Sequence, residues 1–209
     1  MTKPTHAVVS AYLVGLVGLV GLVIMGAPPA SAAQCDGVTV PCAVGDTGPG
    51  GGVVFYVAPS RQSWGQYLEA APKGWSGKPR DAKKAWCTKD DPNVDKVVAT
   101  TKVIATGEGF GAGLANSKMI VKACGRQTAA GLAMGYRGGG KTDWYLPAIK
   151  ELQALMSNHT ASTGLINDFY WSSSQHEFPP CAQGQDAKSS EAGYALKGLK
   201  AAVRPIRAF

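Results

Sequence analysis

The chain has 209 residues, of which 27 are glycine and 17% are charged, and its formal net charge is +7. This length suits one domain behind a leader, and a glycine-rich, weakly charged composition argues against a helical bundle and for a loop-rich fold. The positive charge favours acidic glycans, anionic lipid or cell-wall polymers as partners, with solubility alone as the equally weighted alternative.

The N-terminal segment has the pattern of a secretory leader. A basic residue, Lys3, precedes an apolar run over 7–27, two prolines end the run, and small residues follow at 30–33. We therefore predict a signal peptide over residues 1–33, with cleavage close to its last residue. Because the run is also long enough to span a bilayer, a retained membrane anchor is the alternative.

Cleavage of this leader predicts a secreted or cell-surface protein and disfavours nucleic acid as a partner. A membrane is a partner only if the leader is retained. A short N-terminal segment, 34–43, then precedes a single domain over 44–209.

All five cysteines lie beyond the predicted leader, in a space where disulfides form. Cys35 and Cys42 are close in sequence, and a proline stiffens the turn between them, which favours a local disulfide. We pair Cys87 with Cys124 as the second bond, which leaves Cys181 free or available to another chain. Because no C-x-x-C spacing is present, the sequence predicts no zinc or redox site.

Residues 44–72 predict the first two strands of the domain. A glycine-rich turn over 44–52 leads into an apolar strand over 53–57. The turn lacks the lysine of a phosphate-binding loop and precedes a strand rather than a helix, so a structural role is favoured. A loop over 59–66 and a short strand over 67–71 are expected next.

Residues 73–96 form a long irregular stretch in which two tryptophans stand among basic residues. Aromatic rings stack on sugar faces and cations pair with anions, so this stretch is our candidate glycan-binding site. The alternative, weighed equally, is a solvated loop whose tryptophans are buried, and Trp86, beside a cysteine, favours that role. The candidate ligand-binding residues are Trp75, Lys78, Arg80, Lys83, Lys84 and Lys89.

Two helices are predicted before the middle of the domain. Asn116 is a suitable N-cap for a helix over 117–124, and Thr128 caps a second helix that runs to Tyr136. A glycine turn over 138–140 follows the second helix.

The segment 143–156 is expected to nucleate the core. Bulky residues at 144–146 suit a buried extended segment, and Pro147 is expected in the first turn of a helix. Apolar residues then recur at helical spacing over 149–156. The residues expected on the opposite, polar side of this helix are Lys150, Glu151 and Gln153.

The C-terminal part of the chain predicts further strands. A polar loop over 157–168, a strand over 170–174 and a long loop over 175–192 are expected. A final hairpin would join 194–196 to 202–209, and Pro205 would place its last strand at a sheet edge or a bulge.

Six of these segments, in this order, resemble the C-terminal domain family of the Legionella collagen-like adhesin. The resemblance covers about residues 44–209, and six ordered motifs are more specific than any one of them. The sequence departs from the family at Ala148, where serine is common, at Gln175, where glutamate is usual, and in having no collagen-like repeat before the domain. The six segments are 44–57, 68–72, 139–147, 151–152, 170–174 and 203–209.

The resemblance implies an α+β, C-type-lectin-like fold that is similar to formylglycine-generating enzymes. This fold would have two helices, a small twisted antiparallel sheet and long ligand-presenting loops. It also implies a secreted or surface protein that binds sulfated polysaccharide.

Side-chain chemistry favours a structural role for most of the motif residues. Trp171 suits the core, and the serine hydroxyls at 172–174 suit bonds to the backbone. One of the two C-terminal arginines is expected to pair with Asp143 or Glu151, with surface exposure as the alternative. The structural motif residues are Asp143, Trp144, Leu146, Pro147, Trp171, Ser172, Ser173, Arg204 and Arg207.

Three functions are weighed on this basis. The leading one is a non-catalytic binding domain for acidic polysaccharide or a cell-surface glycan, without a cofactor. The second is a structural envelope protein that acts through protein contacts. An enzyme is third, because a triad of His159, Asp168 and a serine at 172–174 would lack a nucleophile elbow and an oxyanion donor. No metal site is expected, since no ordered acidic loop is present.

Overall fold

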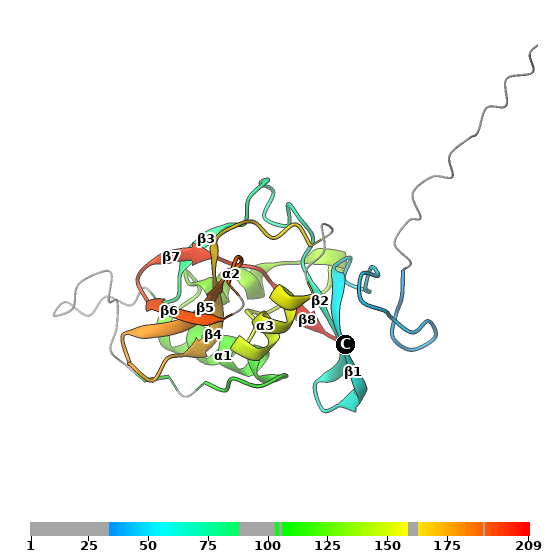
Figure 1. The fold of residues 1–209 in the computed structure, drawn as a ribbon, viewed down its shortest axis with the longest axis horizontal. Coiled ribbons are helices and arrows are strands. Elements are labelled where there is room, and N and C mark those ends of the chain that lie inside the picture. Colours follow the sequence, from blue (N-terminus) through cyan, green and yellow to red (C-terminus); the bar gives the residue numbers. More distant parts are fainter. Residues whose placement is uncertain (1–33, 88–102, 105, 159–162, 190) are drawn as a thin grey trace, which may run out of the picture. The chain divides into compact units, whose positions relative to one another are not determined.

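The computed structural model describes residues 34–87, 103–104, 106–158, 163–189 and 191–209, which form an α+β fold (Figure 1). The predicted leader and the candidate residue Lys89 lie outside these described residues. The predicted α+β class is confirmed. The resemblance implied two helices, whereas the described residues contain three α-helices, in the three regions where the sequence pattern predicted helix.

The described elements are two small sheets, three α-helices and one short 3₁₀ helix. The strands are β1 (Val53–Gln62), β2 (Gly65–Ala70), β3 (Lys83–Ala85), β4 (Phe169–Gln175), β5 (Cys181–Asp186), β6 (Ala192–Leu196), β7 (Lys200–Ala202) and β8 (Ile206–Ala208). The helices are α1 (Ala112–Cys124), α2 (Ala129–Gly135), η1 (Gly138–Gly140) and α3 (Ile149–Ser157).

The first sheet brings distant parts of the sequence together. In it β2 lies between β1 and β8, and both pairings are antiparallel. Because β1 runs on to Gln62 and forms a tight hairpin with β2, the loop predicted over 59–66 is wrong. The outer half of β1 is polar and exposed, so it gives no burial pattern from which a strand could be predicted. β8 is an edge strand, as Pro205 predicted.

The second sheet has the strand order β3-β7-β4-β5-β6 and is mixed rather than antiparallel. β7 pairs with β4 in parallel, through Tyr170 and Ala202. β5 lies inside the loop predicted over 175–192, and β6 pairs with β5, so the predicted C-terminal hairpin is wrong. Glycine and glutamine make β5 a poor strand on propensity, and its neighbours on both sides hold it in the sheet.

The central segment and the C-terminal segment share one core, as predicted. The backbone N–H and C=O groups of Tyr145 bond to those of Ile206, at 2.9 Å each. Tyr145 and Ile206 belong to one buried cluster, and Leu146 and Val203 belong to the neighbouring cluster around the buried tryptophans. These two short segments therefore join the two halves of the core.

The first helix begins earlier than predicted. Gly111, with a φ of 83°, precedes it in the left-handed region that glycine tolerates. Asn116 is not an N-cap but a buried residue of α1, whose side-chain amide bonds to both the N–H and the C=O of Gly107. The cap of α2 is confirmed, since the Thr128 hydroxyl accepts the Gly131 N–H at 3.1 Å.

The helix α3 buries the apolar face that its spacing predicts, but two predictions about it are wrong. Pro147 lies before the N-cap residue, Ala148, and its carbonyl accepts the Ser173 N–H at 2.7 Å. Glu151 is fully buried rather than on the polar side. Its carboxylate accepts the N–H groups of Ala148, at 2.7 Å, and of Gly111, at 2.9 Å. It therefore caps α3 and also bonds to the turn before α1.

Candidate ligand-binding site

The irregular stretch before β3 is fixed to the core through one buried carboxylate, that of Asp81. The Asp81 carboxylate accepts the Trp75 indole N–H at 2.8 Å and the Tyr170 hydroxyl at 2.7 Å. It also pairs with Arg204, at 2.7 Å, and the Arg204 side chain is 1% exposed. Because a buried ion pair is tolerated only when its remaining hydrogen bonds are made, this arrangement sets the loop geometry tightly.

Arg204 uses its other donors on backbone carbonyls. It donates to Ala71, Thr163 and Gly164. Burial and the bond to Asp81 raise the pKa of Tyr170, so its hydroxyl remains a donor to the carboxylate. The loop is therefore a rigid platform for the side chains that it turns outward.

Two neighbouring hollows lie on this platform and share Ser76. One, of about 610 Å³, is lined by residues 76 and 78–83 and thus by Lys78, Arg80 and Lys83. The other, of about 460 Å³, lies between the loop and α2. We call the surface around both the basic face. It comprises Trp75, Lys78, Arg80, Lys83, Lys84, Arg126, Tyr136 and Arg137.

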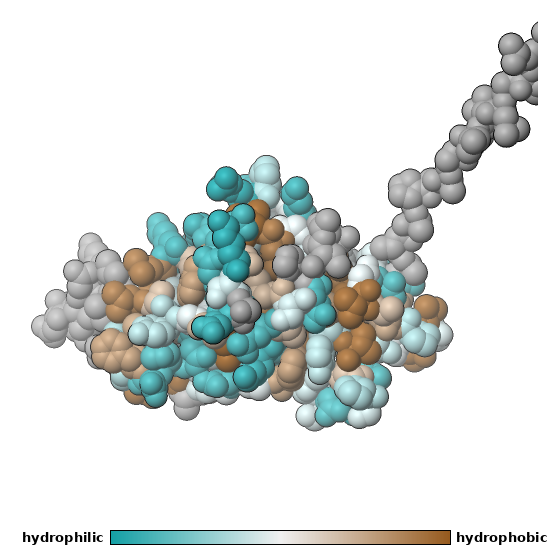
Figure 2. Space-filling model, viewed as in Figure 1, coloured by the Kyte–Doolittle hydropathy of each residue, from teal (hydrophilic) through white to brown (hydrophobic). Residues whose placement is uncertain are grey.

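Most of the cations on the basic face have no acidic partner among the described residues. Lys83 pairs with Asp168 at 2.6 Å, while the Lys84 amine donates to the Gln127 amide oxygen at 3.4 Å. Within the described ranges, none of Lys78, Arg80, Lys84, Arg126 and Arg137 forms an ion pair. Figure 2 shows hydrophilic side chains gathered over the loop before β3, at the top of the view. The face can therefore attract an anion.

Aromatic rings form the wall between the hollow beside α2 and the core. Trp75 and Tyr136 meet edge to face, with centroids 5.5 Å apart, and Tyr136 meets the buried Trp144 at 4.9 Å. Burial and the nearby Glu69 carboxylate raise the pKa of Tyr136, so it presents a neutral hydroxyl. Trp75 is half-buried, which leaves part of its indole surface in the hollow.

The structure brings together most of the predicted ligand-binding residues. Trp75 and Lys84 line the hollow beside α2, and Lys78, Arg80 and Lys83 line the adjacent one. Trp86 was weighed with them, but it is fully buried and its indole N–H donates to the Ser172 carbonyl at 2.8 Å. Its role is structural, as its place beside Cys87 favoured.

Sequence reasoning missed the half of the basic face that α2 contributes. Arg126 and Arg137 flank α2 at its two ends, and Tyr136 directly follows its last residue. A signal for this was present in the sequence, because a basic residue stands on each side of a short apolar helix. In the structure both residues lie on the same surface. The signal could not be assigned to the loop, because nothing local indicates that α2 packs beside residues 75–84.

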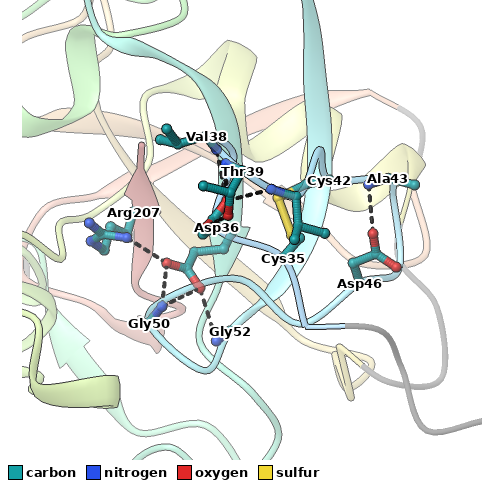
Figure 3. The surroundings of a disulfide bond; sticks show 12 residues. Cys35, Asp36, Val38, Thr39, Cys42, Ala43, Asp46, Gly50, Gly52 and Arg207 are labelled. Atoms are coloured by element: carbon teal, nitrogen blue, oxygen red, sulfur yellow. Dashed lines mark hydrogen bonds and ion pairs between the residues drawn. A yellow bond between two sulfur atoms is a disulfide. The ribbon is translucent and has the colours of Figure 1, made fainter.

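A second buried carboxylate organises the glycine-rich turn. Glu69 accepts the N–H groups of Gly50 and Gly52, each at 3.0 Å, and pairs with Arg207 at 2.8 Å (Figure 3). A Cβ at Gly50 would lie 2.6 Å from a Glu69 oxygen, so only glycine allows this approach. Arg207 also pairs with Asp143, at 2.5 Å. The predicted pairing of a C-terminal arginine with Asp143 is present, whereas Glu69 was not foreseen as a partner.

The serines of β4 are bonded within the fold. The hydroxyls of Ser172 and Ser174 donate to the carbonyls of Gln183 and Gly107, and Ser173 accepts the Asn116 amide N–H. All three are fully buried, as is Trp171, whose indole N–H donates to the Lys84 carbonyl. His159, the third member of the triad considered above, lies outside the described residues. In the described parts of the chain, no group of three His, Cys, Asp or Glu side chains is placed to hold a metal ion.

Both predicted disulfides, Cys35–Cys42 and Cys87–Cys124, are present, and Cys181 is free and buried. Two disulfides are typical of a protein that folds in an oxidising compartment. No helix within the described ranges is long and apolar enough to cross a membrane. The chain matches no family model and no curated sequence.

Proposed function

We propose that this protein is a secreted or surface-associated binding domain for acidic or sulfated polysaccharide, and that the basic face is its binding site. The observation that carries the proposal is the meeting of Trp75 and Lys84 with Arg126, Tyr136 and Arg137 around one hollow. Arginine recognises sulfate and carboxylate through paired N–H donors, and a half-buried indole offers a face to a sugar ring.

The extent of the surface supports a polymer rather than a single small anion. The two hollows of the basic face share Ser76, and a third, of about 340 Å³, adjoins them through Arg80. An extended chain can therefore contact cations contributed by the loop and by α2 together. The resemblance to the adhesin domain family, whose best-understood member binds sulfated polysaccharides, agrees with this proposal.

The proposal is tested by retention on immobilised heparin at increasing salt. The double variant Lys84→Gln/Arg126→Gln removes one cation from each side of the hollow beside α2. Each substitution removes one partly exposed ion pair between a cation of the protein and an anionic group of the polysaccharide. At up to about 1 kcal/mol for each pair, we expect roughly 10-fold weaker binding. Elution at lower salt is expected for the variant, because screening weakens charge–charge attraction.

A matched control removes the same charge elsewhere. Lys118 in α1 and Lys150 in α3 are both exposed and outside the basic face, so Lys118→Gln/Lys150→Gln is expected to elute nearly as the wild type does. If the two double variants lose equal retention, net charge rather than the basic face governs binding. A wild type that heparin does not retain would refute the proposal.

A second candidate function, contact with an envelope protein, is favoured by the Cys35–Cys42 loop. The Asp36 carboxylate accepts the Thr39 hydroxyl and the backbone N–H groups of Val38, Thr39 and Val40. These bonds, that of the hydroxyl first, lower the pKa of Asp36 and hold the loop in place (Figure 3). Val38 is nonetheless 83% exposed. Capture of a defined envelope protein by the wild type, and its loss in Val38→Asp, would establish this function.

A further inference from the structure

A separate cleft of opposite character lies at the far end of the second sheet from β3. It has a volume of about 270 Å³ and is formed by the outer strand β6, by β5, by the turn that follows β4 and by the segment before α1. None of its lining residues belongs to the basic face. They are Glu108, His176, Glu177, Gln183, Ala192, Gly193 and Tyr194.

One wall of this cleft is an aromatic platform. The rings of His176 and Tyr194 stack, with centroids 4.0 Å apart and an angle of 24° between their planes. The Phe178 N–H donates to Nδ1 of His176 at 3.1 Å, which fixes the imidazole ring and leaves Nε2 to carry the proton of its neutral form. Tyr194 is 59% exposed although its ring is held in place by the stacking. A ligand that binds to this aromatic surface therefore does not have to order the side chain first.

The rest of the cleft is acidic and rich in hydrogen-bonding groups. Glu108 accepts a bond from the Gln183 side-chain amide, which orients both side chains. Neither Glu108 nor Glu177 forms an ion pair with any lysine or arginine of the described chain. Although the chain has a net charge of +7, no cation of its described residues neutralises these two carboxylates beside the exposed aromatic ring.

We propose that this cleft binds an amino sugar, a pyranose ring that carries a protonated amine. The apolar C–H face of the ring packs on Tyr194 and the ammonium group pairs with Glu108 and Glu177. The amide N–H groups of Gln183 already bond to Glu108 and to the Gln175 carbonyl, so a ring hydroxyl donates to the side-chain oxygen of Gln183. Such a ligand contacts both parts of the site, because its ring packs on the aromatic surface and its amine pairs with the carboxylates.

Other cationic ligands use only part of the site. The described residues place no group of three His, Cys, Asp or Glu side chains for a metal ion here. A lysine side chain of a peptide would engage the carboxylates but offers no flat apolar face to Tyr194. The site is independent of the proposed polysaccharide site, because their lining residues do not overlap.

The test is a nuclear magnetic resonance titration of the mature protein with a glucosamine tetramer. Backbone signals of residues 176–178 and 192–194 are expected to shift, and binding is expected to weaken at least about fivefold for the N-acetylated tetramer, which lacks the charge. Glu177→Gln is expected to weaken binding about fivefold and Tyr194→Ala about tenfold. Glu191→Gln, an exposed glutamate beside β6 that does not line the cleft, is the matched control and is expected to bind as the wild type does.

Three results would overturn the inference. These are equal binding of the acetylated and free-amine tetramers, equal binding of tetralysine and the glucosamine tetramer, and no shift of the cleft signals. Tetralysine binding would identify a basic peptide as the partner instead. The variant Lys84→Gln/Arg126→Gln separates the two sites, since it is expected to lose heparin binding and to keep glucosamine binding.

Discussion

Three buried carboxylates, Asp81, Glu69 and Glu151, determine how the loops of this domain are held. Asp81 and Glu69 each have an arginine partner, Arg204 and Arg207 respectively, and both arginines come from the C-terminal segment. Glu151 instead accepts backbone N–H groups and the Tyr145 hydroxyl. It is therefore the carboxylate for which burial is least offset by an opposite charge.

This difference predicts a pH dependence of stability. Burial raises the pKa of Glu151 from 4.5 to about 7. Between these pH values the unfolded chain releases the Glu151 proton while the folded chain keeps it, so the free energy of unfolding falls as pH rises and levels off above about 7. This carboxyl accounts for a fall of about 3 kcal/mol.

Urea denaturation of the wild type and of Glu151→Gln at pH 4.5, 5.5, 6.5 and 7.5 measures this contribution. The variant cannot ionise, so the stability difference between the two proteins is expected to shift in the variant's favour as pH rises. Parallel stability curves across this range would show that Glu151 does not titrate in the predicted way.

At the scale of elements, the local sequence pattern was sufficient to predict a helix where one face of that helix is apolar. Helical spacing over 149–156 predicted the buried face of α3, and Thr128 predicted the start of α2. β5 was missed because its composition resembles a loop and its place depends on β4 and β6. The same limit applies to the basic face, since the contact between the loop and α2 is a tertiary one.

Two glycines of α2 provide a paired test of how this helix packs. A Cβ at Gly131 would lie 2.1 Å from the Arg126 carbonyl oxygen, whereas a Cβ at Gly135 would meet nothing within 4 Å. Gly131→Ala is expected to destabilise the protein by about 1–3 kcal/mol through overpacking. Gly135→Ala is expected to be neutral or to stabilise it by up to about 1 kcal/mol, since alanine favours helix.

Thermal or denaturant unfolding of the two alanine variants gives this comparison directly. Changes of the same sign and size would contradict the helix start seen here, with Thr128 as its cap. The test also bears on the proposed binding site, because both glycines line the hollow beside α2.

At the scale of the whole molecule, long-range polar pairs connect the ends of the domain. Arg204 meets Asp81 across 123 residues of sequence, and Arg207 meets Glu69 across 138. The sequence predicted that one C-terminal arginine pairs with Asp143 or Glu151, and the partner is Asp143. Separations of this size leave no local signal for Asp81 or Glu69. The aromatic and basic composition of residues 73–84 could be recognised in the sequence. The packing that brings these side chains onto one surface could not.

The two disulfides are expected to differ in their contribution to stability. Cys87–Cys124 closes a 37-residue separation and Cys35–Cys42 a separation of 7. Loop-closure entropy predicts that Cys87→Ala/Cys124→Ala lowers the free energy of unfolding by about 4 kcal/mol, and Cys35→Ala/Cys42→Ala by about 2 kcal/mol. Denaturant unfolding of the two double variants checks this order, and a larger loss for the short loop would contradict it.

The Asp81 carboxylate separates the side chains that hold the platform from those that face the hollows. Trp75, Tyr170 and Arg204 bond to Asp81. Ser76, Lys78 and Arg80 line the hollow, and the one side-chain bond among them is a long one, 3.4 Å from the Ser76 hydroxyl to the Arg80 carbonyl. A library that randomises positions 76, 78 and 80 and retains Asp81 would therefore sample new specificities at little expense in folding. On the proposed function, the domain would serve as a scaffold for engineered recognition of charged carbohydrates.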